Sequence, residues 1–213
     1  MIDICEAFLR YAHVVQMNGK PLPVNHGYPV RAIVPGVAGC RSVKWLQSIT
    51  IQEEESNNFY QQYDYKILPP QAVDAQAAKQ YWQITPGLQD MPVNSIIAVP
   101  RTGDVITLPP SGRIEIKGYA LPYGDAGPVK KVEISTDDGK TWVDANISDE
   151  SKRGGKWSWV LWTAAVALPK GKKQRILSRA IDAGGNTQEP NPAWNLRGVG
   201  YNGYGESRDL TIQ

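Results

Sequence analysis

The sequence predicts a mainly β protein. Its 213 residues include 20 glycines and 16 prolines, which favour short strands joined by turns over a helical bundle. The second half repeatedly alternates apolar and polar residues over short runs that end at glycine or proline, as half-buried strands do. Hydrophobic residues make up 41% of the chain and charged residues 21%, so the chain can bury a core. The length fits one large domain or two small ones.

The elements expected in the first half are short. The first dozen residues are compatible with a helix or a strand, and Asn18-Gly19 is a strong signal for a tight hairpin. We then expect, in chain order, a strand over 29–35, a strand over 43–52, a loop or helical turn over 53–66, and an extended connection over 67–93 in which 74–82 could form a short helix.

From about residue 95 the alternation becomes regular. A hairpin is expected around Asp138-Gly139. The run 156–168 places Trp157, Trp159 and Leu161 on one face and Val160 and Trp162 on the other. A further strand, 174–182, leads into a glycine turn. Short strands at this spacing predict an immunoglobulin-like β-sandwich. We therefore divide the chain into a first domain, 1–94, and a second domain, 95–213.

Composition and charge exclude several classes of protein. The formal net charge is +2, which is too small to indicate binding to nucleic acid or to an anionic membrane. The sequence shows no signal peptide and no apolar run of transmembrane length, so we expect a soluble protein of unknown compartment. Two cysteines, Cys5 and Cys40, do not form a disulfide framework, and two histidines give no zinc-binding spacing.

The stretch 26–45 gathers cations around glycines and prolines. It contains four basic residues, His26, Arg31, Arg41 and Lys44. Arginine forks and lysine bind phosphate and other oxyanions, and glycine lets backbone N–H groups approach a ligand closely. A solvated Gly/Pro loop explains the same residues equally well, because no Walker-type phosphate loop is present.

Two further stretches carry candidate side chains. The segment 60–66 places three tyrosines beside Asp64, and a tyrosine hydroxyl near cations can donate to an oxyanion or relay a proton. Covering the edge of a core is the ordinary role of such tyrosines. Arg197 lies among aromatic residues and glycines, where it could clamp an oxyanion or simply pack.

Together these stretches resemble one family. The order "MNGKPLPVNHGYPVRAIVPGVAGCRSVKWL", "YDYK" and "WNLRGV" is similar to the C-terminal half of sulfite oxidases, molybdenum-cofactor enzymes related to plant nitrate reductase. The resemblance implies that the first domain is a remnant of the mixed α/β catalytic fold and that the second mediates homodimerisation. The implied roles are cofactor binding by His26, Arg31, Ser42, Val43 and Lys44, and catalytic positions beside the metal and its anionic substrate for Tyr65 and Arg197.

The resemblance also implies a part that these residues lack. In the family a cysteine thiolate ligates molybdenum from a segment preceding the matched residues, and neither Cys5 nor Cys40 has a similar context. Cys40 is expected to be a small, at least half-buried side chain. We therefore expect the chain alone to hold the molybdenum cofactor, molybdopterin, weakly or not at all, and to be inactive towards sulfite. The alternative is a non-catalytic homodimerisation or binding module.

Overall fold

The structure, a computed structural model, describes residues 12–213. They pack as two compact units. The first runs to Met91 and also includes Ala193–Gly200, and the second comprises Pro92–Pro192 and Tyr201–Gln213. The segment 193–200 is a return of the chain that a single boundary at 94/95 does not include. Cys5 and most of the first expected element lie outside the described residues. No helix in the described part is long and apolar enough to cross a membrane.

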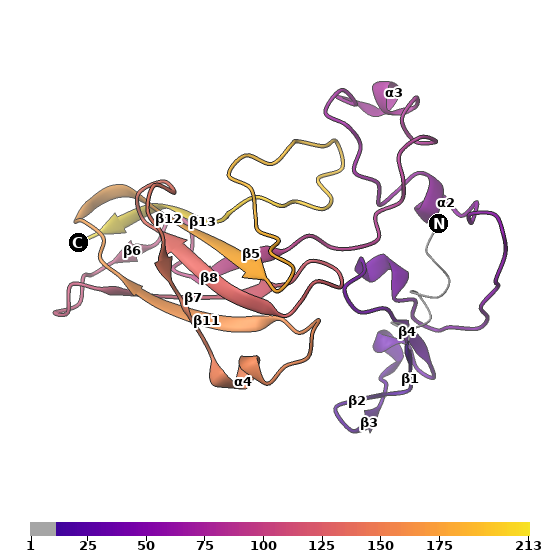
Figure 1. Ribbon diagram of the computed structural model, residues 1–213, viewed down its shortest axis with the longest axis horizontal. Coiled ribbons are helices and arrows are strands. Elements are labelled where there is room, and N and C mark those ends of the chain that lie inside the picture. Colours follow the sequence, from indigo (N-terminus) through magenta and orange to yellow (C-terminus); the bar gives the residue numbers. More distant parts are fainter. Residues whose placement is uncertain (1–11) are drawn as a thin grey trace. The chain divides into compact units, whose positions relative to one another are not determined.

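The first unit consists of short elements (Figure 1). In chain order they are β1 (Ala12–Val14), β2 (Gln16–Met17), β3 (Lys20–Pro21), the 3-10 helix η1 (Val24–His26), β4 (Arg31–Ile33), the 3-10 helix η2 (Gly39–Arg41), α2 (Phe59–Gln62) and α3 (Ala75–Ala78). β1 pairs with β4, and β2 with β3, both antiparallel. The expected hairpin at Asn18-Gly19 is confirmed: both residues have positive φ, as a tight turn between two strands requires.

The prediction of a strand over 43–52 is wrong. Residues 43–52 contain no strand, although Ala32 N–H donates to Val43 O at 2.8 Å and Leu46 N–H to Val30 O at 3.0 Å. Trp45 has φ of 52°, which reverses the backbone between these two bonds and breaks the pleat. The apolar–polar alternation here therefore reflects an irregular segment that follows β4 closely.

A small apolar cluster holds the later part of the first unit together. Leu68, Ala72 and Ala78 are buried, and Tyr81, Trp82 and Leu196 pack against them. Asp74 caps α3, because its Oδ1 accepts hydrogen bonds from the backbone N–H groups of Gln76 and Ala77, both at 2.8 Å. The short helix expected within 74–82 is thus present as α3. Leu196 ties the returning segment 193–200 to this cluster.

The second unit is a β-sandwich, which confirms the mainly β fold. One sheet has the order β10 (Asn146–Ile147), β11 (Val160–Val166), β7 (Ile114–Leu121) and β5 (Asn94–Val99). The other has the order β6 (Val105–Ile106), β13 (Gly205–Ile212), β12 (Gly171–Asp182), β8 (Val129–Ser135) and β9 (Val143–Asp144). The helix α4 (Asp149–Lys152) connects β10 to β11. β8 and β9 pair around the expected Asp138-Gly139 turn.

Alternation along the strands builds the sandwich core. In β11, Val160 and Trp162 lie on the buried face and Leu161 on the exposed face, so the predicted division between two faces is confirmed. Trp162 lies directly against Gly118 of the neighbouring strand: a Cβ at position 118 would come within 2.2 Å of the indole ring. The two sheets also meet through a buried hydrogen bond between the hydroxyls of Ser95 and Ser178, at 2.9 Å.

Candidate functional site

The first part of the site is the turn that carries His26. Gly27 caps the C-terminal end of η1; it has φ of 109° and is buried. A Cβ at this position would lie 3.1 Å from the Cβ atoms of both Arg31 and Lys44. Glycine therefore serves two needs, a left-handed backbone and the close approach of two cationic residues to the turn.

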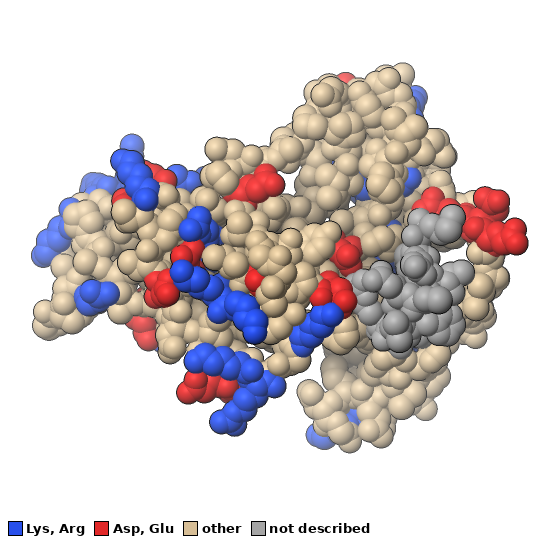
Figure 2. Space-filling view, viewed as in Figure 1, with Lys and Arg blue, Asp and Glu red and all other residues tan. Residues whose placement is uncertain are grey.

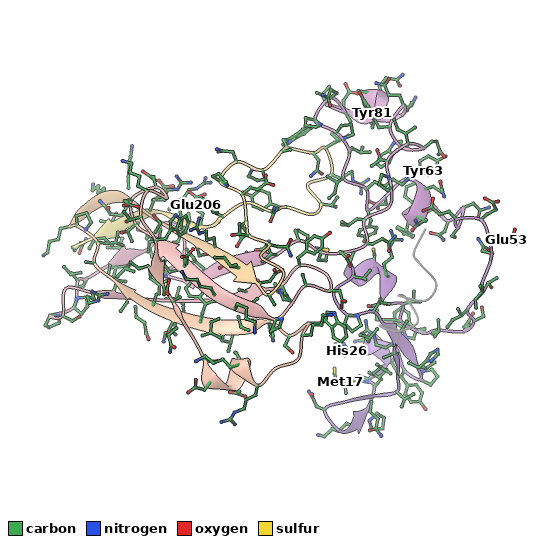
Figure 3. The ribbon with its side chains drawn as sticks, viewed as in Figure 1. Met17, His26, Glu53, Tyr63, Tyr81 and Glu206 are labelled. Carbon is green, nitrogen blue, oxygen red and sulfur yellow. The ribbon has the colours of Figure 1, made fainter. Side chains whose placement is uncertain are left out.

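A set of side chains clamps this turn from the following segment. Three consecutive carbonyl oxygens each accept one side-chain hydrogen bond: Val24 O from Trp45 Nε1 at 2.9 Å, Asn25 O from Lys44 Nζ at 3.0 Å, and His26 O from Arg31 Nη1 at 3.1 Å. We call these six residues the η1 clamp. The Lys44 ammonium also lies 4.6 Å from the centre of the Trp45 ring, within cation–π range. These hydrogen bonds hold His26, Arg31 and Lys44 on one small turn; Figure 3 labels His26 on it.

Ser42 and Val43 join the clamp to β4. Ser42 Oγ accepts from Val34 N–H at 3.1 Å, and Ser42 O accepts from Arg31 Nη2 at 3.3 Å. Val43 O accepts from Ala32 N–H. The structure therefore brings together all five residues expected at the cofactor site.

The main electrostatic property of the clamp is positive charge that no carboxylate of the described residues pairs with. Within residues 12–213, neither Arg31 nor Lys44 forms an ion pair with a carboxylate. Arg31 is half-buried, and its buried Nε–H has no hydrogen-bond partner among residues 12–213. A buried guanidinium donor without a partner is unusual and favours an anionic ligand. The exposed His26 and Lys44 add further donors at the same turn.

Asp64 links the two residues expected at catalytic positions. Its Oδ1 forms an ion pair with Arg197 Nη2 at 2.6 Å and accepts the backbone N–H of Tyr65 at 2.9 Å. Tyr65 has φ of 48°, and its carbonyl accepts from Leu88 N–H at 2.6 Å. Arg197 reaches this place because the segment 193–200 returns to the first unit. Its guanidinium keeps further N–H donors beyond the one that Asp64 accepts, and the side chain is 39% exposed.

Hydrogen bonds join the helix η2 and its N-cap residue to residues 88 and 89. Arg41 Nη2 donates to Leu88 O at 3.2 Å, and Ala38 N–H donates to Gln89 O at 2.8 Å. In the part of the chain that is described, no hydrogen bond or ion pair joins the η1 clamp directly to Tyr65 or Arg197. η2 therefore bonds Leu88, which itself donates to Tyr65 O, and it is followed in the chain by Ser42 of the expected cofactor residues.

Cys40 sits in η2 as a half-buried free thiol. Burial raises the pKa of this thiol above its usual value of 9.0; Arg41 opposes the rise and Asp64 adds to it. At neutral pH the group is therefore a thiol, whereas a thiolate is the form that ligates a metal. Across residues 12–213, no cluster of His, Cys, Asp and Glu is arranged to hold a metal ion.

Trp45 and Gly27 belong to the site but were not expected from sequence. Trp45 was assigned to a strand, and only the three-dimensional structure shows its indole binding Val24 O. Asp64 was noted only as a neighbour of tyrosines, and its pairing with Arg197 spans 133 positions, from 64 to 197. An acidic residue directly before a tyrosine in a polar loop was the one available signal, because Asp often bonds nearby backbone N–H groups.

Comparison with known proteins agrees with this architecture. A family model described as "Mo-co oxidoreductase dimerisation domain" matches residues 85–207, and one described as "Oxidoreductase molybdopterin binding domain" matches residues 6–60. Together they define the class, a molybdenum-cofactor oxidoreductase with part of the molybdopterin domain and a dimerisation domain.

Individual relatives identify the family within this class. The chain is 42% identical over 188 residues to the mitochondrial sulfite oxidase of Homo sapiens, and 39% identical over 194 residues to the sulfite oxidase of Arabidopsis thaliana. It is 36% identical over 195 residues to the NADH nitrate reductase of Volvox carteri. These matches cover 86%, 86% and 89% of this chain, but 33%, 47% and 22% of the respective relatives. The chain belongs to the sulfite oxidase family of molybdenum-cofactor oxidoreductases and spans less than half the length of these relatives.

Proposed function

We propose that the chain is the C-terminal portion of a sulfite oxidase-type oxidoreductase and contributes half of a molybdopterin site. The observation that carries this proposal is the η1 clamp, which fixes His26, Arg31 and Lys44 on one turn without a carboxylate partner among the described residues. Such a turn is suited to the phosphate of the pterin cofactor.

Two details of the turn fit a phosphorylated ligand. The buried Nε–H of Arg31 has no partner in the described part of the chain, and in this proposal it donates to an oxyanion. Gly27 lets Arg31 and Lys44 pack close to the turn, because a Cβ at this position would crowd both residues, and so both cations stay beside His26. In this proposal Arg31 and Lys44 neutralise the phosphate, His26 donates from its ring, and Ser42 and Val43 hold the segment that positions Lys44.

Tyr65 and Arg197 supply the second half of the proposed role. Arg197, oriented by Asp64, attracts and orients the sulfite anion, while the Tyr65 hydroxyl donates a hydrogen bond beside it. When bound, the molybdenum cofactor supplies the oxygen-atom transfer to sulfite and accepts two electrons. The residues of this chain bind and orient the reactants.

We further propose that a polypeptide of these 213 residues does not oxidise sulfite by itself. The resemblance places the molybdenum-ligating cysteine in a segment that precedes the matched residues, and among residues 12–213 no group of His, Cys, Asp and Glu is arranged to hold a metal ion. Metal analysis, ultraviolet-visible absorbance and a sulfite assay with an added electron acceptor test this directly. We expect no molybdenum and no turnover; stoichiometric metal with turnover would contradict the proposal.

Cofactor binding is tested separately from activity. Isothermal titration with isolated molybdopterin, with and without its phosphate, should show that the phosphate improves affinity. We expect Arg31→Ala to remove that improvement, because the buried guanidinium is lost. Lys170→Ala, which removes an exposed cation in the second unit, is the matched control and should have no effect. Equal affinity for both forms of the pterin would contradict a phosphate site at the η1 clamp.

The second unit is proposed to form a homodimer. The match to a dimerisation-domain family covers most of this unit, and the unit has its own closed core. The alternative function, a non-catalytic homodimerisation module, rests on the same observation. A dimer that binds neither pterin nor metal would favour the module, whereas phosphate-dependent pterin binding would favour the oxidoreductase.

A further inference from the structure

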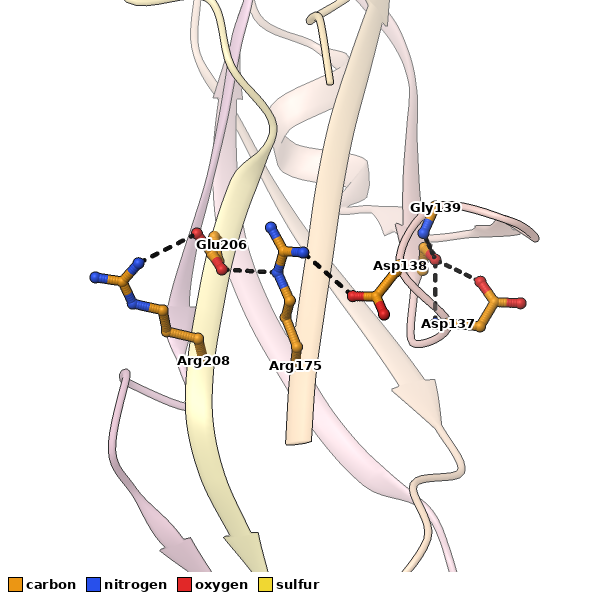
Figure 4. A network of polar contacts seen from close by, with 7 residues as sticks. Asp137, Asp138, Gly139, Arg175, Glu206 and Arg208 are labelled. Atoms are coloured by element: carbon orange, nitrogen blue, oxygen red, sulfur yellow. Dashed lines mark hydrogen bonds and ion pairs between the residues drawn. The ribbon is translucent and has the colours of Figure 1, made fainter. Parts of the chain in front are cut away.

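The two outer faces of the β-sandwich differ in chemistry. On the five-stranded sheet, Arg175 bonds Glu206 at 2.7 Å and Asp138 at 3.2 Å (Figure 4). On the same sheet, Arg179 bonds Glu133 at 2.7 Å and lies 4.2 Å from the centre of the Trp142 ring. Figure 2 shows positive and negative side chains interspersed over the second unit. The outer face of the five-stranded sheet therefore satisfies its own charges and suits contact with water.

The outer face of the four-stranded sheet changes from charged to apolar along β7. Glu115 and Lys117 pair with each other at 2.9 Å, whereas Tyr119 and Leu121, farther along the same face, carry no charge. Tyr119 stands opposite Ile96 of β5 on one side and opposite Leu161 of β11 on the other. A row of apolar side chains thus crosses three strands.

Trp159 extends this row. Its ring meets the ring of Tyr119 edge-on, with centroids 5.5 Å apart. Trp159 is 60% exposed and Leu161 55% exposed. We call the five residues that form this surface the β7 patch: Ile96, Tyr119, Leu121, Trp159 and Leu161.

The β7 patch has the composition of a protein interface. Aromatic residues with an apolar body are enriched where two proteins meet, and charged residues are depleted from the centre of such contacts. The patch is carried by the paired strands β5, β7 and β11, so its side chains are held on a rigid scaffold. Contiguous exposed apolar surface bounded by polar residues marks an interaction site.

We infer that the β7 patch is the surface through which the second unit binds a second copy of this chain. This inference rests on the homodimer proposed above and names its contact face. A two-fold dimer brings the same patch together with itself, so the patch must be compatible with its own image. The five residues carry no charge to repel their image. The rim offers both signs, Lys117 and Glu115, so opposite charges can meet across the axis.

Two matched substitutions test whether the β7 patch is the dimer interface. Leu161→Lys places a charge in the β7 patch, and Val143→Lys places the same charge on β9 of the other sheet, at a side chain of similar exposure, 51%. Analytical ultracentrifugation over a range of concentrations gives the dimer dissociation constant. We expect Leu161→Lys to raise it by at least about 30-fold, as loss of a central interface contact does, and Val143→Lys to leave it within about threefold of wild type.

The possible outcomes distinguish the proposal that the chain forms a homodimer from the proposal that the β7 patch is the interface. A wild-type chain that is still monomeric at a protein concentration of about 100 μM would overturn both the homodimer and the role of the β7 patch. A wild-type dimer that tolerates Leu161→Lys and Trp159→Lys would keep the homodimer and overturn the patch. Circular dichroism verifies that each variant folds. If the variants unfold, hydrogen exchange of wild-type β7 and β11 decides: protection that rises with concentration supports the patch, and protection independent of concentration overturns it.

Discussion

The indole Nε1 of Trp45 donates a hydrogen bond to the carbonyl of Val24 at 2.9 Å, and this contact closes the η1 clamp at one end. The bond joins positions 21 residues apart and depends on the positive φ of Trp45, which turns its ring back towards η1. The ring also lies under the Lys44 ammonium. One residue thus supports both the backbone of the turn and one of its cations.

Trp45→Phe should weaken pterin binding, although it keeps an aromatic side chain at position 45. Phenylalanine keeps an aromatic face for Lys44 but has no N–H donor for Val24 O, so the turn that carries His26 is held less firmly. We expect a loss of about 1 kcal/mol in unfolding free energy, typical of one hydrogen bond, and about 3- to 10-fold weaker binding of molybdopterin by calorimetry. Trp194→Phe is the matched control at a similarly exposed tryptophan. Unchanged affinity in Trp45→Phe would show that the contact does not position the turn.

Gly27→Ala should destabilise the first unit more than Gly19→Ala. Both glycines have positive φ, so alanine strains the backbone at each position. Only at Gly27 would the new Cβ lie 3.1 Å from two other Cβ atoms, whereas nothing lies within 4 Å at Gly19. Denaturant unfolding should show an extra loss of about 1 kcal/mol for Gly27→Ala. Equal losses would mean that the neighbouring residues move aside freely.

Asp64 and Arg197 should be energetically coupled. Their ion pair joins the returning segment to the first unit, and the Asp64 side chain is only 15% exposed. A double-mutant cycle with Asp64→Asn and Arg197→Met, followed by denaturant unfolding, should give a coupling energy of about 0.5–1 kcal/mol. Asparagine keeps an oxygen for the Tyr65 N–H, so the cycle isolates the ion pair. Strictly additive effects would argue against a role of Asp64 in orienting Arg197.

Stability should fall at low pH through Asp137. Hydrogen bonds from the Thr141 hydroxyl and backbone N–H and from the Ser135 hydroxyl lower the pKa of Asp137 from 3.8 to about 2. Because the folded pKa is depressed, the stabilisation is present above pH 3.8 and is lost as the pH falls towards 2. The stability difference between wild type and Asp137→Asn, measured by denaturant unfolding, should therefore shrink between pH 4 and pH 2. A difference that stays constant over this range would contradict the assignment.

Cys40 should react slowly with thiol reagents at neutral pH. Burial raises the pKa of its thiol above 9.0, so little thiolate forms below that pH. In a Cys5→Ser background, the rate of alkylation by iodoacetamide should climb as the pH passes 9. Fast alkylation that is independent of pH between 7 and 8 would indicate a thiolate and reopen a metal-binding role for Cys40.

Several features of the fold followed from local sequence. The alternation correctly divided Leu161 from Val160 and Trp162, which lie on opposite faces of β11. The Asn18-Gly19 and Asp138-Gly139 turns were found because each has residues that tolerate positive φ. The strand over 43–52 failed for the converse reason: the positive φ of Trp45 has no local signature, since tryptophan rarely adopts it.

The sequence by itself determined the β-sandwich, its turns, the family and the set of candidate residues, because side-chain periodicity and turn chemistry act between near neighbours in the chain. Only the tertiary structure decided which of those residues meet: that Trp45, Lys44 and Arg31 each bind one carbonyl of η1, and that Arg197 returns to Asp64. Such contacts depend on how the folded backbone brings distant segments together, and one residue in an unexpected φ region redirects a whole segment.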